Sequence, residues 1–551
     1  MRTGGEILVD CLQAQGVERV FCVPGESYLA VLDALHGREI ETVSARQEGG
    51  AAMMAEADGK LTGRPGVCLV TRGPGATNAA AGVHVAQQDS TPMVLFVGQV
   101  GRRMVGRDAF QEVDYGQMFR GMAKWVAEIN HADRIPEVIS HAWHVAMAGR
   151  PGPVVIALPE DMLARETADV RPGPRVEVAD PAPTAAAMAE LAELLAAAQR
   201  PILVVGGARW DPEAIAVLRR FAEAWQLPVG CSFRRQRLFD HTHPSYAGDV
   251  GLGINPALRQ RVAEADLLLL LGARFSENPS QGFTLLDIPA PRHQLVHVHP
   301  GAEEIGRIYA PRLGINATPG TFLAAAERLV PPEAPPWAGA AAAAHASYRT
   351  WSTPKGDGPG ALRMGTVMAA LAERLPSDAI MTNGAGNYAG WLHRYWRFRG
   401  EDTQLAPTSG SMGYGLPAAI AAKRRYPGRE VVCFAGDGCL QMTLQEIGTA
   451  AQIGADILLL VIDNQSYGTI RMHQERHYPG RVAATHLQNP DFAAVVRAYG
   501  GYGATVTADA EVADALAAAL AAPGLRLLHL KTDVEAITPS ATLTDLRVRT
   551  S

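Results

Sequence analysis

The 551-residue sequence lacks the features that mark exported, membrane-spanning or nucleic-acid-binding proteins. Its six cysteines form no CxxC pair and mostly lie among apolar residues, which indicates reduced core thiols rather than disulfides or a zinc site. No apolar run approaches the roughly 18 residues of a transmembrane helix, and the opening MRTGGEILVDCLQAQG predicts an amphipathic helix rather than a leader. No block of Lys or Arg could follow a phosphate backbone, and the net charge is only -6. We therefore expect a cytoplasmic protein without nucleic-acid or membrane partners.

The sequence does contain abundant apolar residues in an α/β pattern. With 47% hydrophobic and 19% charged residues, the chain can bury large cores, and its length suggests about three domains. Segments 167–184 and 330–360, rich in Pro or Ala, are typical of linkers and separate predicted domains over 1–166, 185–330 and 361–545.

Short β-branched runs alternate with Ala-rich helical stretches in each predicted domain. The runs are VCLVTRG and PMVLFVG in the first, PILVVGG, ADLLLLLGA and HQLVHVH in the second, and EVVCFAG, ILLLVID and RLLHLKT in the third. Continuous apolar strands separated by helices favour parallel sheets that are covered on both faces. We therefore predict an α/β protein of three doubly wound domains with mainly parallel sheets.

In the last third of the chain, a polar turn follows each of two neighbouring apolar runs. Doubly wound sheets bind ligands outside the carboxyl ends of their strands, which is where these turns should lie. Gly436-Asp437-Gly438 should start a helix of about 13 residues. This helix runs back along the sheet over roughly the length that the next strand covers in the opposite direction. Asp437 and Asn464 should therefore lie at the same edge, or rim, of the sheet. Carboxylate, amide and carbonyl oxygens suit Mg²⁺, which bridges to phosphates, and the glycines let backbone N–H groups approach those phosphates. Each turn alone could be an ordinary turn, but the strand–helix–strand context favours a phosphate site.

The same two turns resemble the diphosphate-anchoring motif of thiamine-diphosphate-dependent enzymes, with Asp463 in place of the first residue of its Asn-Asn end. The resemblance implies Mg²⁺ held by Asp437, Asn464 and the backbone carbonyl of Ser466. The resemblance extends over nearly the whole chain, and the group that the chain resembles is the acetolactate synthases. It therefore implies a pyrimidine-binding first domain, a central domain and a diphosphate-binding third domain, with the thiamine-diphosphate-binding fold in the first and third.

Thiamine chemistry also requires an activating carboxylate. The thiazolium C2 proton must be lost to give an ylid, and the cofactor's 4′-amino group removes it only when a carboxylate engages N1′. Glu48 follows the extended ETVSA and opens an Ala-rich helix, in a setting similar to that of the family's activating glutamate. A Glu in a first helical turn is also favourable with the helix dipole alone. Because Glu48 occurs in the same chain as the distant metal motif, we favour the catalytic interpretation.

Two further segments resemble cofactor-binding segments of the family. SGSMGYGLPAA is similar to the segment that grips the aminopyrimidine, which implies that the Gly410 carbonyl accepts from the 4′-amino group and that Met412 holds the bent cofactor. Ordinary core packing is the alternative for Met412. TNGAGNYAGW is similar to the loop that meets the diphosphate, and implies contacts from Gly386, Asn387 and Tyr388.

Loops of the first domain complete the implied site. VPGES, which contains Gly25, and AFQE match loops that face the thiazolium, and the resemblance implies that Phe110 and Gln111 line the substrate pocket. The remaining cofactor-contacting positions implied by the two motif turns are Gly436, Gly438, Cys439, Tyr467 and Gly468.

The chain departs from the acetolactate synthases in its central domain. The family's Arg-Phe-Asp-Asp-Arg is Arg274-Phe275-Ser276-Glu277-Asn278 here, so the guanidinium expected to bind a second substrate's carboxylate is missing. His299 replaces an Asp typical of nucleotide-binding relatives, and Gly206-Gly207 is too short for a dinucleotide loop. His473 stands where acetolactate synthases have a tryptophan, although it could equally be an exposed helix residue. These departures leave FAD binding open and make acetolactate a less favoured product.

The resemblance implies an enzyme that makes or breaks a carbon–carbon bond next to a carbonyl, as a decarboxylase or carboligase. It implies a 2-oxo acid or related 2-hydroxy ketone as the substrate, a C2 ylid and an enamine intermediate, and a homodimer or homotetramer. The alternative is a cofactor-binding, non-catalytic regulatory protein of the same fold. Glu48 argues against that alternative, because a protein without the chemistry does not need this carboxylate.

Overall fold

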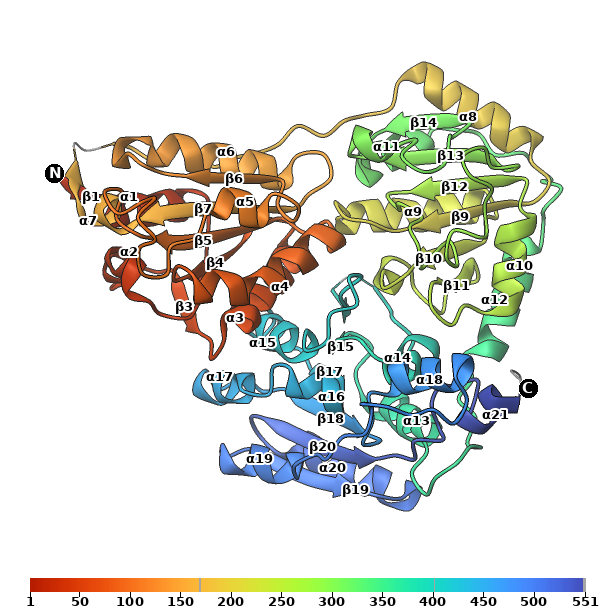
Figure 1. Ribbon diagram of the computed structural model, residues 1–551. Helices are drawn as coiled ribbons and strands as arrows, with labels where there is room; N and C mark the ends of the chain where they lie inside the picture. The colour runs from red at the N-terminus through yellow and green to blue at the C-terminus, as the bar shows by residue number, and fades with distance from the viewer. Residues whose placement is uncertain (168–169, 401, 549–551) are drawn as a thin grey trace. The chain divides into compact units, whose positions relative to one another are not determined.

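The computed structural model describes residues 1–167, 170–400 and 402–548 (Figure 1). These residues contain three six-stranded sheets in which every strand pairing is parallel, together with a two-stranded antiparallel ribbon of β1 (Arg2–Thr3) and β8 (Glu166–Thr167). This confirms the predicted α/β class. Backbone contacts group the chain into two compact units, one comprising 1–179, 407–428 and 440–457 and the other the remaining residues. None of the described helices is both long enough and apolar enough to cross a bilayer.

The first sheet lies in the first unit and has the strand order β3-β2-β4-β5-β7-β6. Its strands are β2 (Arg19–Cys22), β3 (Glu41–Ser44), β4 (Gly66–Val70), β5 (Met93–Gln99), β6 (Trp125–Glu128) and β7 (Pro153–Pro159). Figure 1 shows helices on both sides of it; they are α1 (Gly4–Ala14), α2 (Leu29–Leu35) and α6 (Ile135–Met147), and α3 (Glu48–Thr62) and α4 (Pro74–Asp89). β4, β5 and β7 are buried along their whole length, as the continuous apolar runs predict.

The central sheet has the order β11-β10-β9-β12-β13-β14. Its strands are β9 (Pro201–Val205), β10 (Val229–Ser232), β11 (Tyr246–Val250), β12 (Leu267–Leu271), β13 (Gln294–His299) and β14 (Leu313–Asn316), and its helices include α8 (Ala185–Ala197), α9 (Pro212–Ala224), α10 (Pro256–Glu264) and α11 (Pro319–Ala326). Alternate residues of one strand enter opposite cores: Leu203 and Val205 join one apolar cluster, and Ile202 and Val204 the other. A sheet with a core on each face is the doubly wound arrangement.

The third sheet has the order β16-β15-β17-β18-β20-β19. Its strands are β15 (Ile380–Asn383), β16 (Gln404–Leu405), β17 (Val431–Gly436), β18 (Leu458–Asp463), β19 (Tyr502–Val506) and β20 (Arg526–Lys531). The helices of the same unit include α13 (Met364–Arg374), α14 (Ala389–Tyr395), α18 (Gly468–His477), α19 (Phe492–Ala498), α20 (Val512–Ala521) and α21 (Leu543–Val548). Two helices from this part of the sequence, α15 (Gly415–Arg425) and α17 (Glu446–Gln452), belong to the first unit.

Two sequence expectations about local structure are wrong. The Ala-rich stretch inside 330–360 is not a linker throughout but contains α12 (Ala340–Trp351), which buries Ala344 and Tyr348 against the central sheet. Alanine is the strongest helix former, so one buried stripe is enough to fix this helix. The helix of about 13 residues predicted after Asp437 is instead two short helices, α16 (Asp437–Gln441) and α17, separated by 442–445. Of the other proposed linker, 167–184, residues 168–169 lie outside the described residues.

Candidate cofactor site and active site

The two motif turns follow neighbouring strands of the third sheet. β17 and β18 pair in parallel with Gly436 opposite Ile462, so Asp437 and Asn464 come directly after the carboxyl ends of adjacent strands. The Asp437 side chain is only 3% exposed, and its Oδ1 accepts from the N–H of Gly438 at 2.8 Å. Its Oδ2 accepts from Nδ2 of Asn489, also at 2.8 Å.

Asp463 occupies the position where the motif usually has its first Asn, and its carboxylate is paired with basic side chains of the protein. Its Oδ2 accepts from Nε2 of His529 at 2.8 Å and from Nζ of Lys531 at 2.6 Å. Burial opposes ionisation of Asp463, but these donors outweigh it and hold its pKa below the usual range. Burial, with Asp463 nearby, raises the pKa of Asp437 to about 7. Asp437 is therefore the carboxylate on this rim that an added cation would stabilise.

The turn after β18 is held by its own hydrogen bonds. Oδ1 of Asn464 accepts from the N–H of Ser466 at 3.1 Å, and the Ser466 carbonyl accepts from the N–H of Gly468, the first residue of α18, at 2.7 Å. The described residues contain no group of three or more His, Cys, Asp or Glu side chains arranged to hold a metal. A metal on this rim would therefore have one carboxylate, an amide and a carbonyl, and that donor set fits Mg²⁺ that keeps water or phosphate oxygens as its other ligands.

The predicted diphosphate loop is tied to the start of α18. The Asn387 N–H donates to Oγ1 of Thr469, and that hydroxyl donates to Oδ1 of Asn387, both at 3.0 Å. Gly386 has φ 150°, a conformation that favours glycine. The Tyr388 hydroxyl accepts from the N–H of Gly384 and donates to Sγ of Cys439, both at 3.1 Å. The Tyr388 hydroxyl therefore links the two ends of this arrangement, the backbone at Gly384 and the side chain of Cys439.

The glycines of the motif also have a packing role. A Cβ on Gly436 would lie 2.6 Å from the ring of Tyr388, and one on Gly438 would lie 2.6 Å from the ring of Tyr467. Larger residues at either position would push an aromatic ring off the turn. The Gly-Asp-Gly pattern thus has a structural cause beside the approach to phosphate that the sequence suggested.

Glu48 lies in the first unit as the first residue of α3. The preceding Gln47 caps the helix, since its Oε1 accepts from the N–H groups of Gly49 at 2.6 Å and Gly50 at 3.2 Å. The half-buried Glu48 carboxylate instead accepts from Nδ2 of Asn78 at 2.9 Å. Because Gln47 satisfies the helix end, capping does not explain an acidic residue at position 48.

A second glutamate, which the sequence analysis missed, supports this turn. Glu446 is fully buried in α17, and its Oε2 accepts from the Arg46 N–H at 3.2 Å and from the Thr449 hydroxyl at 2.6 Å. A Cβ on Gly50 would lie 2.4 Å from its Oε1. Burial raises the pKa of Glu446. An acidic residue within the otherwise apolar and small stretch EIGTAA was the available sequence signal.

The remaining predicted site residues of the first unit lie on turns. Phe110 is 76% exposed, and its carbonyl accepts from Nε of Arg72 at 3.3 Å. Gln111 has φ 65°, a left-handed conformation, and Gly410 has φ 72°. Met412 is half-buried rather than part of the core. A Cβ on Gly25 would lie 2.5 Å from that of Thr71.

The predicted residues thus divide between the two units. The first contains Gly25, Glu48, Phe110, Gln111, Gly410 and Met412. The second contains Gly386, Asn387, Tyr388, Gly436, Asp437, Gly438, Cys439, Asn464, Ser466, Tyr467 and Gly468.

Two of the central-domain positions that bear on nucleotide binding, His299 and Gly207, make internal contacts. Nδ1 of the buried His299 accepts from the N–H of Gly301 at 3.0 Å. Gly207 is close-packed, because its Cβ would lie 2.0 Å from the carbonyl oxygen of Gly272. His473 is exposed on α18, where its ring stacks on His477 with centroids 6.2 Å apart. These contacts give no support for a dinucleotide loop at Gly206-Gly207.

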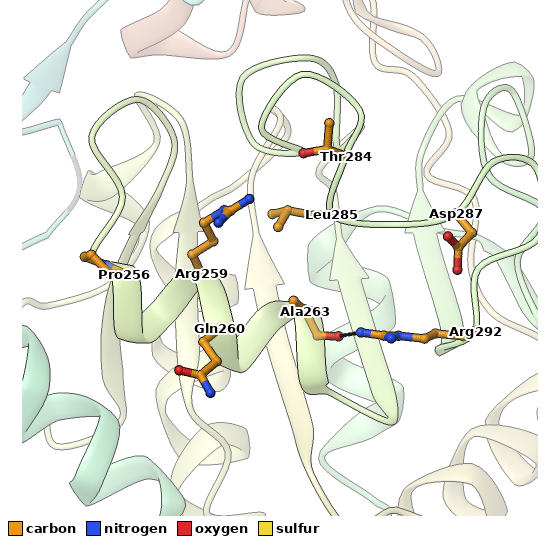
Figure 2. Close-up of a pocket in the computed structure, with 8 residues that line it drawn as sticks. All are labelled: Pro256, Arg259, Gln260, Ala263, Thr284, Leu285, Asp287 and Arg292. Atoms are coloured by element: carbon orange, nitrogen blue, oxygen red, sulfur yellow. Dashed lines mark hydrogen bonds between the residues drawn. The ribbon is translucent and has the colours of Figure 1, made fainter. Parts of the chain in front are cut away.

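A separate hollow of about 500 Å³ lies on the central domain beside α10 (Figure 2). Its lining includes Arg259, Thr284 and Arg292, and Nη2 of Arg292 donates to the Ala263 carbonyl at 2.5 Å. Figure 2 shows that the polar side chains are spread around the hollow and do not converge on one point. This arrangement does not favour a specific ligand.

The sequence matches three family models, and together they define the class of protein. The N-terminal TPP binding domain of thiamine pyrophosphate enzymes matches residues 2–118, the central domain matches 188–326, and the C-terminal TPP binding domain matches 384–530. The chain therefore belongs to the thiamine pyrophosphate enzyme family.

Within that family, the chain is similar to acetolactate synthases. It is 32% identical to the acetolactate synthase isozyme 2 large subunit of Escherichia coli (strain K12), over 96% of this chain and 95% of the relative. It is 33% identical to the acetolactate synthase large subunit of Parasynechococcus marenigrum (strain WH8102), over 95% and 86%. It is 30% identical to that of Lactococcus lactis subsp. lactis (strain IL1403), over 90% and 87%. The resemblance inferred from the motifs is thereby confirmed.

Proposed function

We propose that the protein is a thiamine-diphosphate-dependent carboligase or decarboxylase that acts on a 2-oxo acid or a related 2-hydroxy ketone. The observation that carries the proposal is the pair of motif turns at the ends of β17 and β18, in a chain that also carries Glu48 at the start of α3. Membership of the family and similarity to acetolactate synthases over most of the chain support it.

Mg²⁺ would be held by Asp437, Asn464 and the Ser466 carbonyl. Asp437 suits this role because it is buried, it already accepts two hydrogen bonds, and no cation of the protein is paired with it in the contacts described above. Asn387 and Gly386 would meet the diphosphate, and Tyr388 would set the shape of their loop through Gly384 and Cys439. Gly436, Gly438, Cys439, Tyr467 and Gly468 would form the rest of the diphosphate cradle.

Bound thiamine diphosphate would supply a C2 centre that can bond to a substrate carbonyl carbon and stabilise negative charge there. Glu48 would hold a hydrogen bond to the pyrimidine ring and stabilise the tautomer that accepts the C2 proton. Asn78 would orient the Glu48 carboxylate, and Glu446 would fix the turn through the Arg46 N–H. Gly25, Gly410 and Met412 would position the pyrimidine and thiazolium, and Phe110 and Gln111 would border the substrate.

We further propose a homodimer or homotetramer in the cytoplasm, with domains over 1–166, 185–330 and 361–545. The family resemblance implies that the pyrimidine domain of one subunit serves the diphosphate domain of another. All six cysteines are buried free thiols, which suits a reducing compartment. FAD is not part of the proposal, because His299 and Gly206-Gly207 make internal contacts.

A screen of 2-oxo acids tests the function. The protein would be incubated with each acid, with and without thiamine diphosphate and Mg²⁺, while CO₂ release and products are followed by mass spectrometry. We expect turnover of at least one acid that requires both additions. Absence of turnover with the cofactor fully bound would favour the non-catalytic regulatory protein.

A further inference from the structure

A cavity of about 420 Å³ lies wholly within the second unit. The ends of β10 and β11, together with α12, α14 and α18, contribute its lining, and Gly386 and Asn387 of the proposed diphosphate loop form part of the wall. Its volume is within the range of roughly 300–1,000 Å³ found for pockets that enclose drug-sized ligands. A 2-oxo acid with only a methyl substituent would leave most of it empty.

The walls of this cavity are mainly aromatic and apolar. Their aromatic and larger apolar residues are Phe233, Tyr246, Leu252, Tyr348, Trp351 and Met472, and the lining also contains Arg234, His393, Arg394, His473 and Arg476. The rings of Tyr246 and Tyr348 meet edge to face, with centroids 4.7 Å apart and planes at 83°. Packed rings of this kind form a rigid surface that suits a flat apolar group.

One acidic residue in the lining has a carboxyl oxygen without a hydrogen-bond partner. Oδ1 of Asp249, in β11, is shielded from solvent and accepts no hydrogen bond from the described residues. Burial raises its pKa to about 7, opposed by the nearby charge of Arg234. Buried polar atoms in native proteins normally have a partner, so this unpartnered oxygen in a cavity wall points to a ligand.

Arg234 lines the same cavity just beyond the end of β10. It is only 6% exposed and has φ 57°, a left-handed backbone conformation that an arginine rarely adopts. Such strain persists where the surroundings fix it, and it is concentrated at functional sites. Arg234 thus brings a guanidinium to the lining of this cavity, although position 278, where the acetolactate synthases have an arginine, is an asparagine.

We propose that this cavity is part of the substrate site, and that the substrate is a 2-oxo acid with an aromatic substituent. The rings of the walls hold the aromatic group, while Arg234, beside Asp249, donates to the carboxylate. This assignment rests on the proposed function and adds the class of substrate to it. Flavin is the competing occupant, and the flavin content of the purified protein distinguishes the two.

Three probes separate the contributions of ring and carboxylate: phenylpyruvate has both, pyruvate lacks the ring, and phenylacetone has a methyl group in place of the carboxylate. Binding to the holoenzyme is measured by rapid-mixing tryptophan fluorescence before turnover, since Trp351 lies in the wall. We expect phenylpyruvate to bind at least about tenfold more tightly than either other probe. Equal or tighter binding of pyruvate would overturn the proposal, as would stoichiometric flavin in the purified protein.

Two variants test the two halves of the site. Arg234→Gln should weaken phenylpyruvate binding by about tenfold and leave phenylacetone unchanged, whereas Arg349→Gln on α12, outside the lining, should change neither. Leu252→Trp, at a wall position that is 63% exposed, should weaken both aromatic probes by about tenfold and spare pyruvate. Val330→Trp, which is 86% exposed and outside the lining, is its control. Unchanged phenylpyruvate binding in both Arg234→Gln and Leu252→Trp would refute the assignment.

Exchange of the C2 proton of bound cofactor separates this inference from the proposed function. If C2 exchanges at the rate of an activated cofactor but phenylpyruvate shows no preference, the function stands and the substrate assignment fails. If phenylpyruvate binds in the cavity but C2 does not exchange, the proposed function fails, and the proposal of a substrate fails with it.

Discussion

The carboxylates of Asp437 and Asp463 share one amide donor, Nδ2 of Asn489, which lies 2.8 Å from Oδ2 of the first and 2.8 Å from Oδ1 of the second. The two carboxylates differ in their other partners. Asp463 is paired with Lys531 and His529, whereas Asp437 accepts hydrogen bonds only from neutral donors in the contacts described. A divalent cation beside Asp437 would complete the charge balance on this rim.

Replacing Asp437 tests the metal site. Asp437→Ala removes the only carboxylate of the proposed ligand set, so we expect thiamine diphosphate affinity in the presence of Mg²⁺ to fall by at least about 10²-fold with the fold retained. Titration calorimetry measures the affinity, and circular dichroism checks the fold. Asp514→Ala, on the exposed face of α20, is the matched control. Wild-type affinity in Asp437→Ala would exclude this residue as a ligand.

The sheets were the most predictable part of the structure, because burial on both faces leaves continuous apolar runs such as ILLLVID in the sequence. The rim that carries Asp437 and Asn464 followed from the alternation of strand and helix. The break at 442–445 did not, because the residues around it are all compatible with a helix. Glu446 and Asp249 were missed, since their importance depends on contacts between segments that are distant in sequence.

Glu475 predicts an acid-sensitive attachment of the C-terminal helix. This fully buried residue of α18 accepts from Arg547 of α21 through both carboxylate oxygens at 2.9 Å, and from Nη2 of Arg471 at 2.7 Å. The hydrogen bonds from Arg547, against an opposing effect of burial, lower the pKa of Glu475 from 4.5 to about 2. Glu475→Gln should therefore reduce the free energy of unfolding at pH 7 by about 1–3 kcal/mol.

The difference in the free energy of unfolding between wild type and Glu475→Gln should depend on pH in a predictable direction. A depressed folded-state pKa means that the stabilisation is complete above pH 4.5 and is lost as the pH falls toward about 2. Urea unfolding of wild type and Glu475→Gln should thus show a gap that is constant between about pH 7 and pH 5 and narrows below it. Glu535→Gln, which removes a more distant partner of Arg547 at 3.8 Å, should show a smaller gap. A Glu475→Gln gap that widens on acidification would contradict the assignment.

The assembly can be tested directly. Glu48 belongs to the first unit and Asp437 to the second, and the family resemblance pairs such domains across subunits. Multi-angle light scattering of the holoenzyme should give the mass of a dimer or tetramer of the 58.6 kDa chain. Dilution below the dissociation constant should abolish turnover. A monomer with full activity would refute the shared site.

The measurement that tests the central claim most directly is C2 proton exchange in Glu48→Gln. The substitution keeps the size and the hydrogen bonding of the side chain but removes the charge that favours the proton-accepting tautomer, so cofactor binding should survive. Exchange at C2 of bound thiamine diphosphate is followed by NMR after quenching in deuterium oxide, and it requires no knowledge of the substrate. We predict a fall of at least about 10²-fold, in line with the loss of a positioned acid–base group. An exchange rate equal to that of the wild type would mean that Glu48 only begins a helix, and would contradict the catalytic account.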